Sequence, residues 1–147
     1  MNQTPRLIEW LDRLSDAHVL CVGDVMLDRF VYGDVDRISP EAPIPVLHIK
    51  REALAVGGAG NVARNLSALG AGVRLFGVIG DDGAGSATAG VLEGDATVKT
   101  DLITDPARPT TVKTRFIAGV QQMLRTDEED LSPIARDVLD EMLRGVT

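Results

Sequence analysis

The sequence predicts an α/β fold in which an open parallel sheet lies beside a second, smaller sheet. Short apolar runs typical of buried strands alternate with segments of helical periodicity, as parallel strands joined by helices require. Four further segments mix apolar and charged residues like half-exposed strands and fall outside that alternation. Hydrophobic residues make up 44% of the chain and aromatic residues 3%, so we expect an aliphatic core. A cleft is expected where the two sheets meet.

The elements of the parallel sheet follow one another along the chain. The run from His18 to Val22 is apolar and ends at Gly23, which is typical of a buried parallel strand. Ser132 is predicted to cap the final helix, with Pro133 in its first turn. In order, the sequence predicts a helix over 5–15, a strand over 18–22, a helix from 60 to 70, a strand over 73–79, a helix over 84–93, a strand over 101–104 and a helix after 132.

The helix that precedes Gly70 is predicted from its spacing of apolar residues. Val62, Leu66 and Leu69 recur at helical intervals, and Gly70 provides the C-terminal stop. These three side chains are therefore expected to face the sheet.

The second sheet is predicted from four segments, over about 29–36, 44–51, 110–117 and 121–126. The third segment alternates in polarity and is rich in β-branched residues, which favours a strand buried on one side. The fourth follows closely enough to be its hairpin partner. Between the first two, three prolines over 37–45 exclude a helix and indicate an extended loop.

The charge and composition of the chain limit which binding partners and which cellular compartment we expect. The net charge is −7, from 22 acidic and 15 basic residues, so a nucleic acid is not expected as a partner. No apolar run reaches the roughly 18 residues that span a bilayer, and the N-terminus lacks a signal pattern. We therefore expect a cytoplasmic protein that does not bind membranes. Cys21 is the single cysteine, lies in an apolar run and is expected in the core.

The glycine-rich segment from Val56 to Gly70 is the most informative motif. Adjacent glycines before a helix let the backbone approach a ligand and leave helix N–H groups free to donate. Asn61 adds a side chain that can donate and accept hydrogen bonds. A glycine turn that only packs tightly has the same local composition, so both interpretations remain open.

A dinucleotide fingerprint is one alternative for this segment. Gly58, Gly60 and Ala63 have the spacing G-x-G-x-x-A, and Asp81 follows 23 residues after Gly58. That fingerprint needs a buried strand directly before the first glycine, whereas residues 50–56 are charged and only briefly apolar. No Walker A motif is present.

The same segment resembles the first signature of the ribokinase-like (PfkB) sugar kinases. The fixed positions of that signature are matched by Gly57, Gly58, Ala59, Asn61, Ala63, Gly70 and Gly80. The segments 22–28 and 80–83 continue the resemblance on both sides. Segments 36–46, 108–115 and 121–129 are similar to the branch that phosphorylates a heptose 7-phosphate. The resemblance implies an α/β fold that forms the N-terminal half of a doubly wound sheet with a small β-sheet lid.

The resemblance also implies roles for individual residues. Asp28 matches the acid that binds sugar hydroxyls, and Gly57, Gly58 and Asn61 match the substrate loop. Arg108 matches an arginine that binds the phosphate already on the substrate, and a guanidinium suits that anion. Arg115 is a second candidate for the phosphate. The four strand segments match the lid, and lids of several members pair, so we expect a homodimer.

The resemblance implies ATP and Mg²⁺ as cofactors of the intact enzyme, with a nucleotide site mostly outside this chain. The catalytic Asp of the family belongs to a late Gly-Ala-Gly-Asp motif, and the nearest match is residues 83–86, where Ser86 replaces Asp. No catalytic residue and no metal ligand is therefore identified in this chain.

A parallel sheet of about three strands with an uncovered edge also indicates a truncated protein. The function that the resemblance implies is phosphorylation of D-glycero-D-manno-heptose 7-phosphate to the 1,7-bisphosphate, on the route to ADP-heptose and the lipopolysaccharide core. This chain is expected to be the sugar-binding half and inactive alone. The alternatives are a non-catalytic module for sugar-phosphate binding or dimerisation, and a kinase for another sugar.

Overall fold

The computed structural model describes residues 4–146 of the predicted domain 1–147, so residues 1–3 and 147 lie outside the described residues. None of the described helices is long and apolar enough to cross a membrane. The elements are α1 (Thr4–Asp12), a 3₁₀ turn (Arg13–Asp16), β1 (His18–Val22), β2 (Val25–Ile38), β3 (Pro45–Gly58), α2 (Ala59–Ala68), β4 (Gly72–Ile79), α3 (Gly83–Glu93), β5 (Val98–Thr104), β6 (Val112–Ala118), β7 (Gln121–Glu128) and α4 (Arg136–Val146).

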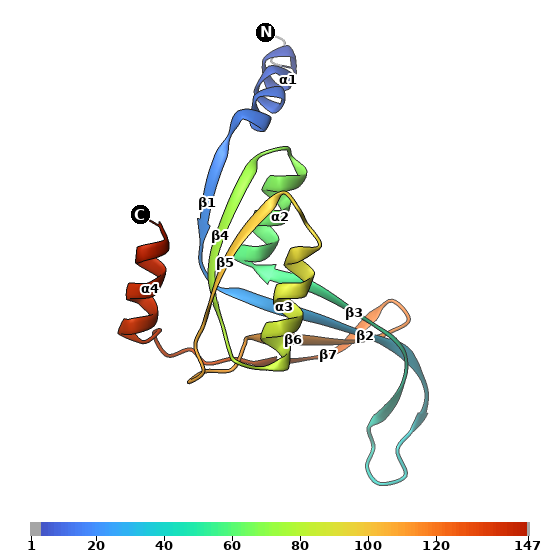
Figure 1. The fold of residues 1–147 in the computed structure, drawn as a ribbon. Helices are drawn as coiled ribbons and strands as arrows, with labels where there is room; N and C mark the ends of the chain where they lie inside the picture. Colours follow the sequence, from blue (N-terminus) through green and yellow to red (C-terminus); the bar gives the residue numbers. More distant parts are fainter. Residues whose placement is uncertain (1–3, 147) are drawn as a thin grey trace.

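The first sheet is parallel and has the strand order β1-β4-β5 within the described residues. Helices α2 and α3 lie on one side of it and α4 on the other (Figure 1). This arrangement confirms the predicted alternation of strands and helices. β5 begins three residues earlier than predicted, at Val98, because the buried side chain of Val98 already belongs to the core.

The second sheet contains all four predicted segments, in the order β3-β2-β6-β7. β2 pairs with β3 antiparallel and with β6 parallel, and β6 pairs with β7 antiparallel. Among the described residues this sheet has four strands and the parallel sheet has three, so the prediction that the second sheet is the smaller one is wrong. β2 and β3 are also longer than predicted, at 14 residues each, and their hairpin projects away from the parallel sheet (Figure 1).

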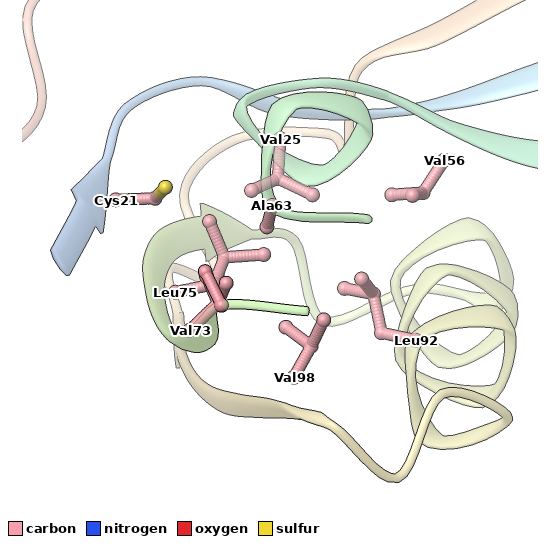
Figure 2. Packing of buried hydrophobic residues seen from close by; sticks show 9 residues of the cluster. Cys21, Val25, Val56, Ala63, Val73, Leu75, Leu92 and Val98 are labelled. Atoms are coloured by element: carbon pink, nitrogen blue, oxygen red, sulfur yellow. The ribbon is translucent and has the colours of Figure 1, made fainter. Parts of the chain in front are cut away.

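The main core joins the two sheets. Buried aliphatic residues of β4 and β5 pack against α2 and α3, and Val25 and Val56 contribute from the bases of β2 and β3 (Figure 2). Cys21 belongs to the same cluster, as expected. Because β2 and β3 enter this core at one end, the base of the four-stranded sheet is fixed relative to the parallel sheet.

Two predictions of burial are wrong. Val62 of α2 and Leu69, the residue that caps its C-terminus, are 52% and 53% exposed, because α2 approaches the sheet through the buried residues Gly60 and Ala63. A side chain at position 60 would meet the Val56 methyl groups, so only a glycine permits this close packing. β1 is parallel as predicted but not buried, because it is an edge strand whose Val22 is 53% exposed.

The last helix begins at Arg136, so the prediction that Ser132 caps it is wrong. The Leu139 N–H donates to the Ala135 carbonyl at 3.0 Å, which places the first turn after the proline. Ser132 has another partner, since its carbonyl accepts a hydrogen bond from Nη2 of Arg108 at 2.9 Å. α4 packs through Val138 and Met142 on the second face of the parallel sheet.

Candidate functional site

One face of the four-stranded sheet carries a row of polar side chains near its base. Asp28 of β2 lies directly opposite Ala55 of β3 and Lys113 of β6, and Lys113 lies opposite Asp127 of β7. Directly opposed residues on neighbouring strands share a face of the sheet. The next row on this face contains Phe30 and Arg115. We call these two rows together the polar face.

Asp28 and Arg115 form an ion pair across the two rows. Nη1 of Arg115 donates to Oδ1 of Asp28 at 2.5 Å, and the two side chains are 22% and 18% exposed. The guanidinium of Arg115 also lies 5.2 Å from the centroid of the Phe30 ring. Partial burial strengthens such a charge-assisted hydrogen bond. The structure therefore brings together two of the predicted site residues from positions 87 apart in sequence.

Gly57 lies beside the other oxygen of Asp28. A Cβ atom at position 57 would lie 2.7 Å from Oδ2 of Asp28 and 2.7 Å from Cγ of Met26, so any side chain would displace the carboxylate. The missing side chain leaves Oδ2 accessible from the backbone of β3.

Gly58 is required for a backbone reason. Its φ is 59°, in the left-handed region that favours glycine, and a Cβ there would collide with the Asp24 carbonyl. That carbonyl accepts a hydrogen bond from Ala59 N–H at 2.8 Å as α2 begins. Tight packing therefore accounts for Gly58, whereas Gly57 is also adjacent to a candidate ligand-binding carboxylate.

Asn61 lies in the exposed first turn of α2. It lines a surface hollow of about 500 Å³ with Arg64, Asn65 and Asp95. The contacts of the described residues do not connect it to Asp28.

A cavity of about 460 Å³ lies at the carboxyl end of β1, next to the polar face. Its lining includes Asp24, Met26 and Arg108, and segment 129–134 closes it from the side of α4. Ligands of open α/β sheets bind at the carboxyl ends of the strands, so the position is suitable for a substrate. Sequence reasoning missed Asp24 and Met26, although both belong to the resembling segment 22–28.

Arg108 lies in the wall of this cavity and is already paired. Its Nε lies 3.3 Å from Oδ2 of Asp105, and Nη2 donates to the Ser132 carbonyl at 2.9 Å. The side chains of Arg108 and Asp105 are 16% and 6% exposed. The Nε contact is an ion pair without hydrogen-bond geometry, because this buried nitrogen has no hydrogen-bond acceptor among the described residues. Arg108 therefore connects segment 105–111 to the segment before α4.

Lys113 is a second cation near Asp28, directly opposite it on β6, that sequence reasoning did not single out. Its Nζ donates to Asp127 and Glu129, each at 3.0 Å. The hydrogen bonds to Glu129 and Asp127 raise the pKa of Lys113, and the hydrogen bond from Lys113 lowers the pKa of Asp127. The alternation of charges at 113 and 115 in a predicted strand was a signal that both residues share one face.

Asp82 fixes the start of β6, and with it the position of Lys113 and Arg115. Its Oδ1 accepts from Gly85 N–H at 2.6 Å and from the Thr110 hydroxyl at 2.7 Å, and its Oδ2 accepts from Thr110 N–H at 2.8 Å. The Thr110 hydroxyl oxygen accepts in turn from Gly80 N–H at 2.8 Å. The backbone hydrogen bond from Thr110 is the largest of the effects that lower the pKa of Asp82.

Comparison with known proteins identifies the family. The model of the pfkB family carbohydrate kinases matches residues 16–142. The chain belongs to the pfkB family of carbohydrate kinases. The PfkB resemblance found in the sequence is therefore confirmed.

Curated relatives share about half of their aligned residues with this pfkB chain. The chain is 51% identical over 138 residues to the bifunctional protein HldE of Hyphomonas neptunium. The aligned region covers 94% of this chain and 28% of that relative. The bifunctional protein HldE of Caulobacter vibrioides is 57% identical over 115 residues, covering 78% and 24%. That of Paramagnetospirillum magneticum is 48% identical over 146 residues, covering 99% and 30%. The chain thus spans less than a third of the length of these relatives.

Solved structures of other kinases have a similar fold. A carbohydrate kinase from Agrobacterium tumefaciens superposes with a TM-score of 0.61 at 25% identity, covering 76% of this chain and 35% of that one. Phosphofructokinase-2 of Escherichia coli, in complex with fructose-6-phosphate, gives 0.60 at 18% identity and covers 88% and 40%. These likenesses confirm the predicted ribokinase-like fold class.

The dinucleotide alternative does not fit the fold. Residues 50–58 do form a strand, but it belongs to β3, which pairs antiparallel with β2 in the four-stranded sheet. The fingerprint requires a strand of a parallel βαβ unit before its first glycine.

Proposed function

We propose that the protein carrying this chain transfers the γ-phosphate of ATP to the anomeric hydroxyl of D-glycero-D-manno-heptose 7-phosphate, yielding the 1,7-bisphosphate. The observation that carries the proposal is 48% identity over 99% of the chain to a protein named bifunctional HldE. The reaction would belong to ADP-heptose and lipopolysaccharide core synthesis in the cytoplasm. This chain would supply the sugar-binding half and be inactive alone.

Each predicted site residue has a role in this proposal. The Asp28 carboxylate would accept hydrogen bonds from sugar hydroxyls, because a carboxylate can accept several at once. Gly57 would allow the backbone to approach the sugar, Gly58 would form the tight turn that leads into α2, and Asn61 would hydrogen-bond to the sugar. Arg108 and Arg115 are the two candidates for the substrate's existing phosphate. The 2.5 Å contact between Asp28 and Arg115 supports a joint site.

ATP with Mg²⁺ would supply the phosphoryl group, and we assign no residue of this chain to either. What the chain would contribute is orientation of the acceptor and exclusion of water. The four-stranded sheet would act as a lid whose polar face covers the sugar. The catalytic aspartate is expected outside this chain.

Calorimetric titration of this chain with the heptose 7-phosphate, and separately with ATP, tests the proposal. We expect saturable sugar-phosphate binding and no ATP binding. Asp28→Asn should weaken sugar binding about tenfold or more, as for loss of a charged hydrogen bond. Asp34→Asn is the matched control, because Asp34 lies on the same strand with its side chain 68% exposed.

The outcomes separate the alternatives. A folded chain that ignores the heptose phosphate contradicts the substrate assignment, and tight binding of fructose-6-phosphate instead would indicate a kinase for another sugar. Unchanged sugar affinity in Asp28→Asn removes Asp28 from the site.

We further propose that two copies of the chain pair through the four-stranded sheet. Its end far from the parallel sheet exposes an apolar hollow of about 430 Å³, lined by Val35, Ile44, Pro45, Leu47, Phe116, Met123 and Leu124. Leu124 is 56% exposed and Ile44 57%. Burial of such a surface against a second copy would be favourable.

Sedimentation equilibrium tests the pairing. Leu124→Glu should convert a dimer to a monomer, whereas Leu69→Glu, at a comparably exposed leucine just after α2, should not. A monomeric wild-type chain, or a dimer unaffected by Leu124→Glu, contradicts the proposal.

A further inference from the structure

The two candidate phosphate-binding arginines have different surroundings. Arg108 lies between Asp105 and Ser132: its Nε is 3.3 Å from the Asp105 carboxylate without hydrogen-bond geometry, and its Nη2 donates to the Ser132 carbonyl. Reassigning it to a ligand would leave the nearly buried carboxylate of Asp105 without its cation, which is costly. These contacts indicate that Arg108 holds segment 105–111 in place.

Arg115 also hydrogen-bonds through one nitrogen, but its carboxylate partner Asp28 is more exposed than Asp105, at 18% against 6%. Its hydrogen bonds to other described residues all leave from Nη1, to Asp28 at 2.5 Å and to the Lys113 carbonyl at 3.5 Å. Nε and Nη2 remain able to donate to an acceptor on the polar face. A guanidinium can therefore bind an anion there while it keeps the bond to Asp28.

The register of the strands makes this pairing informative. Lys113, not Arg115, lies directly opposite Asp28, yet Lys113 bonds to the carboxylates of Asp127 and Glu129. Arg115 reaches Asp28 from the next row. Lys113 is therefore held toward β7 by its two carboxylate partners. Arg115, which has further N–H groups able to donate, is the cation that contacts Asp28.

Charge balance points to the same residue. The ion-paired network on this sheet contains three cations (Lys113, Arg115 and Arg125) and three carboxylates (Asp28, Asp127 and Glu129). Arg125 and Lys113 share Asp127, and Lys113 has two carboxylates. Arg115 and Arg125 each have one carboxylate partner among the described residues, but of the two it is Arg115 that bonds to Asp28, so a dianion bound beside Asp28 would gain most from Arg115.

We propose that Arg115, rather than Arg108, binds the phosphate monoester of the phosphorylated sugar while it holds Asp28. This inference rests on the proposed function and names the specificity-determining residue of that site. Because one side chain contacts both the phosphate and the hydroxyl-binding carboxylate, recognition of the two groups is coupled. A sugar without its phosphate leaves the free donors of Arg115 without an anion.

The test measures the affinity of the chain for the heptose 7-phosphate and for the same sugar without phosphate. Arg115→Gln should lower the preference for the phosphorylated sugar by between about tenfold and about 100-fold, as for loss of a charged hydrogen bond. Arg108→Gln is the matched control, and should leave that preference unchanged even if both affinities fall together. Arg115→Lys keeps the charge but not the planar fork, and should give an intermediate preference.

A double-mutant cycle tests the coupling. Asp28→Asn and Arg115→Gln combined should weaken phosphorylated-sugar binding less than the product of the single effects. An unchanged preference in Arg115→Gln, or its collapse in Arg108→Gln, overturns the inference. A folded wild-type chain that binds neither sugar contradicts the proposed function instead. Circular dichroism checks that each variant is folded. If Arg115→Gln does not fold, the preference for the phosphorylated sugar is measured with Arg115→Lys instead.

Discussion

Removal of the Asp82 carboxylate should destabilise the fold by about 3 kcal/mol. Asp82→Ala deletes the N-cap of α3, whose oxygen accepts from Gly85 N–H at 2.6 Å, a loss of about 1 kcal/mol. It also deprives the N–H of Thr110 of its acceptor, and Thr110 is 2% exposed. Buried donors left without partners cost about 1 to 3 kcal/mol. The sum is about 2 to 4 kcal/mol.

Urea unfolding followed by circular dichroism measures this loss. With a slope of about 2 kcal/mol/M, the midpoint of Asp82→Ala should fall by about 1.5 M. Asp130→Ala is the matched control, because Asp130 also accepts a local backbone bond, from Ser132 N–H at 2.8 Å, but is exposed. Its urea midpoint should fall by much less than that of Asp82→Ala. Equal losses in the two variants would refute the reasoning, since burial of Thr110 would then have no effect.

Two further predictions concern pH and the glycine beside Asp28. The pKa of Asp82 is lowered in the folded state, so its contribution to stability is complete above the unfolded pKa of about 3.9 and is lost as pH falls through the lower folded value. Between about pH 5 and about pH 3 the urea midpoint of the wild type should therefore fall more than that of Asp82→Ala, and parallel curves would contradict this. Gly57→Ala should weaken sugar-phosphate binding about tenfold or more, because the Cβ displaces the Asp28 carboxylate, and calorimetry showing unchanged affinity would remove Gly57 from the site.

Periodicity and glycine positions were sufficient to predict the fold class, because parallel strands and helices leave local patterns. The length of β3 was not predictable in this way. Residues 50–54 of β3 include charged side chains and an exposed leucine, since this part of the hairpin has no core beneath it. β2 begins at Val25, before the predicted start near 29, because the apolar Met26 and Phe30 between its buried residues Val25, Leu27 and Val31 obscure the alternation.

The candidate site was only partly predictable for a related reason. The residue types at 28, 57 and 115 matched a motif, but the pairing of Asp28 with Arg115 depends on strand register across 87 residues. The false cap at Ser132 has the same origin. Its carbonyl is bound by an arginine 24 residues earlier, and no local pattern contains that contact.

The long hairpin of β2 and β3 has a mechanical consequence. Fourteen residues per strand, at about 3.3 Å each, give an arm about 45 Å long. Asp28 is the fourth residue of β2, near the fulcrum formed by the core around Val25 and Val56. A swing of about 10° about that fulcrum would move Asp28 by about 2 Å but the tip by about 8 Å. Residues near the anchored base of the hairpin, such as Asp28, thus move by no more than about 2 Å, while anything bound at the tip of the hairpin moves about four times as far.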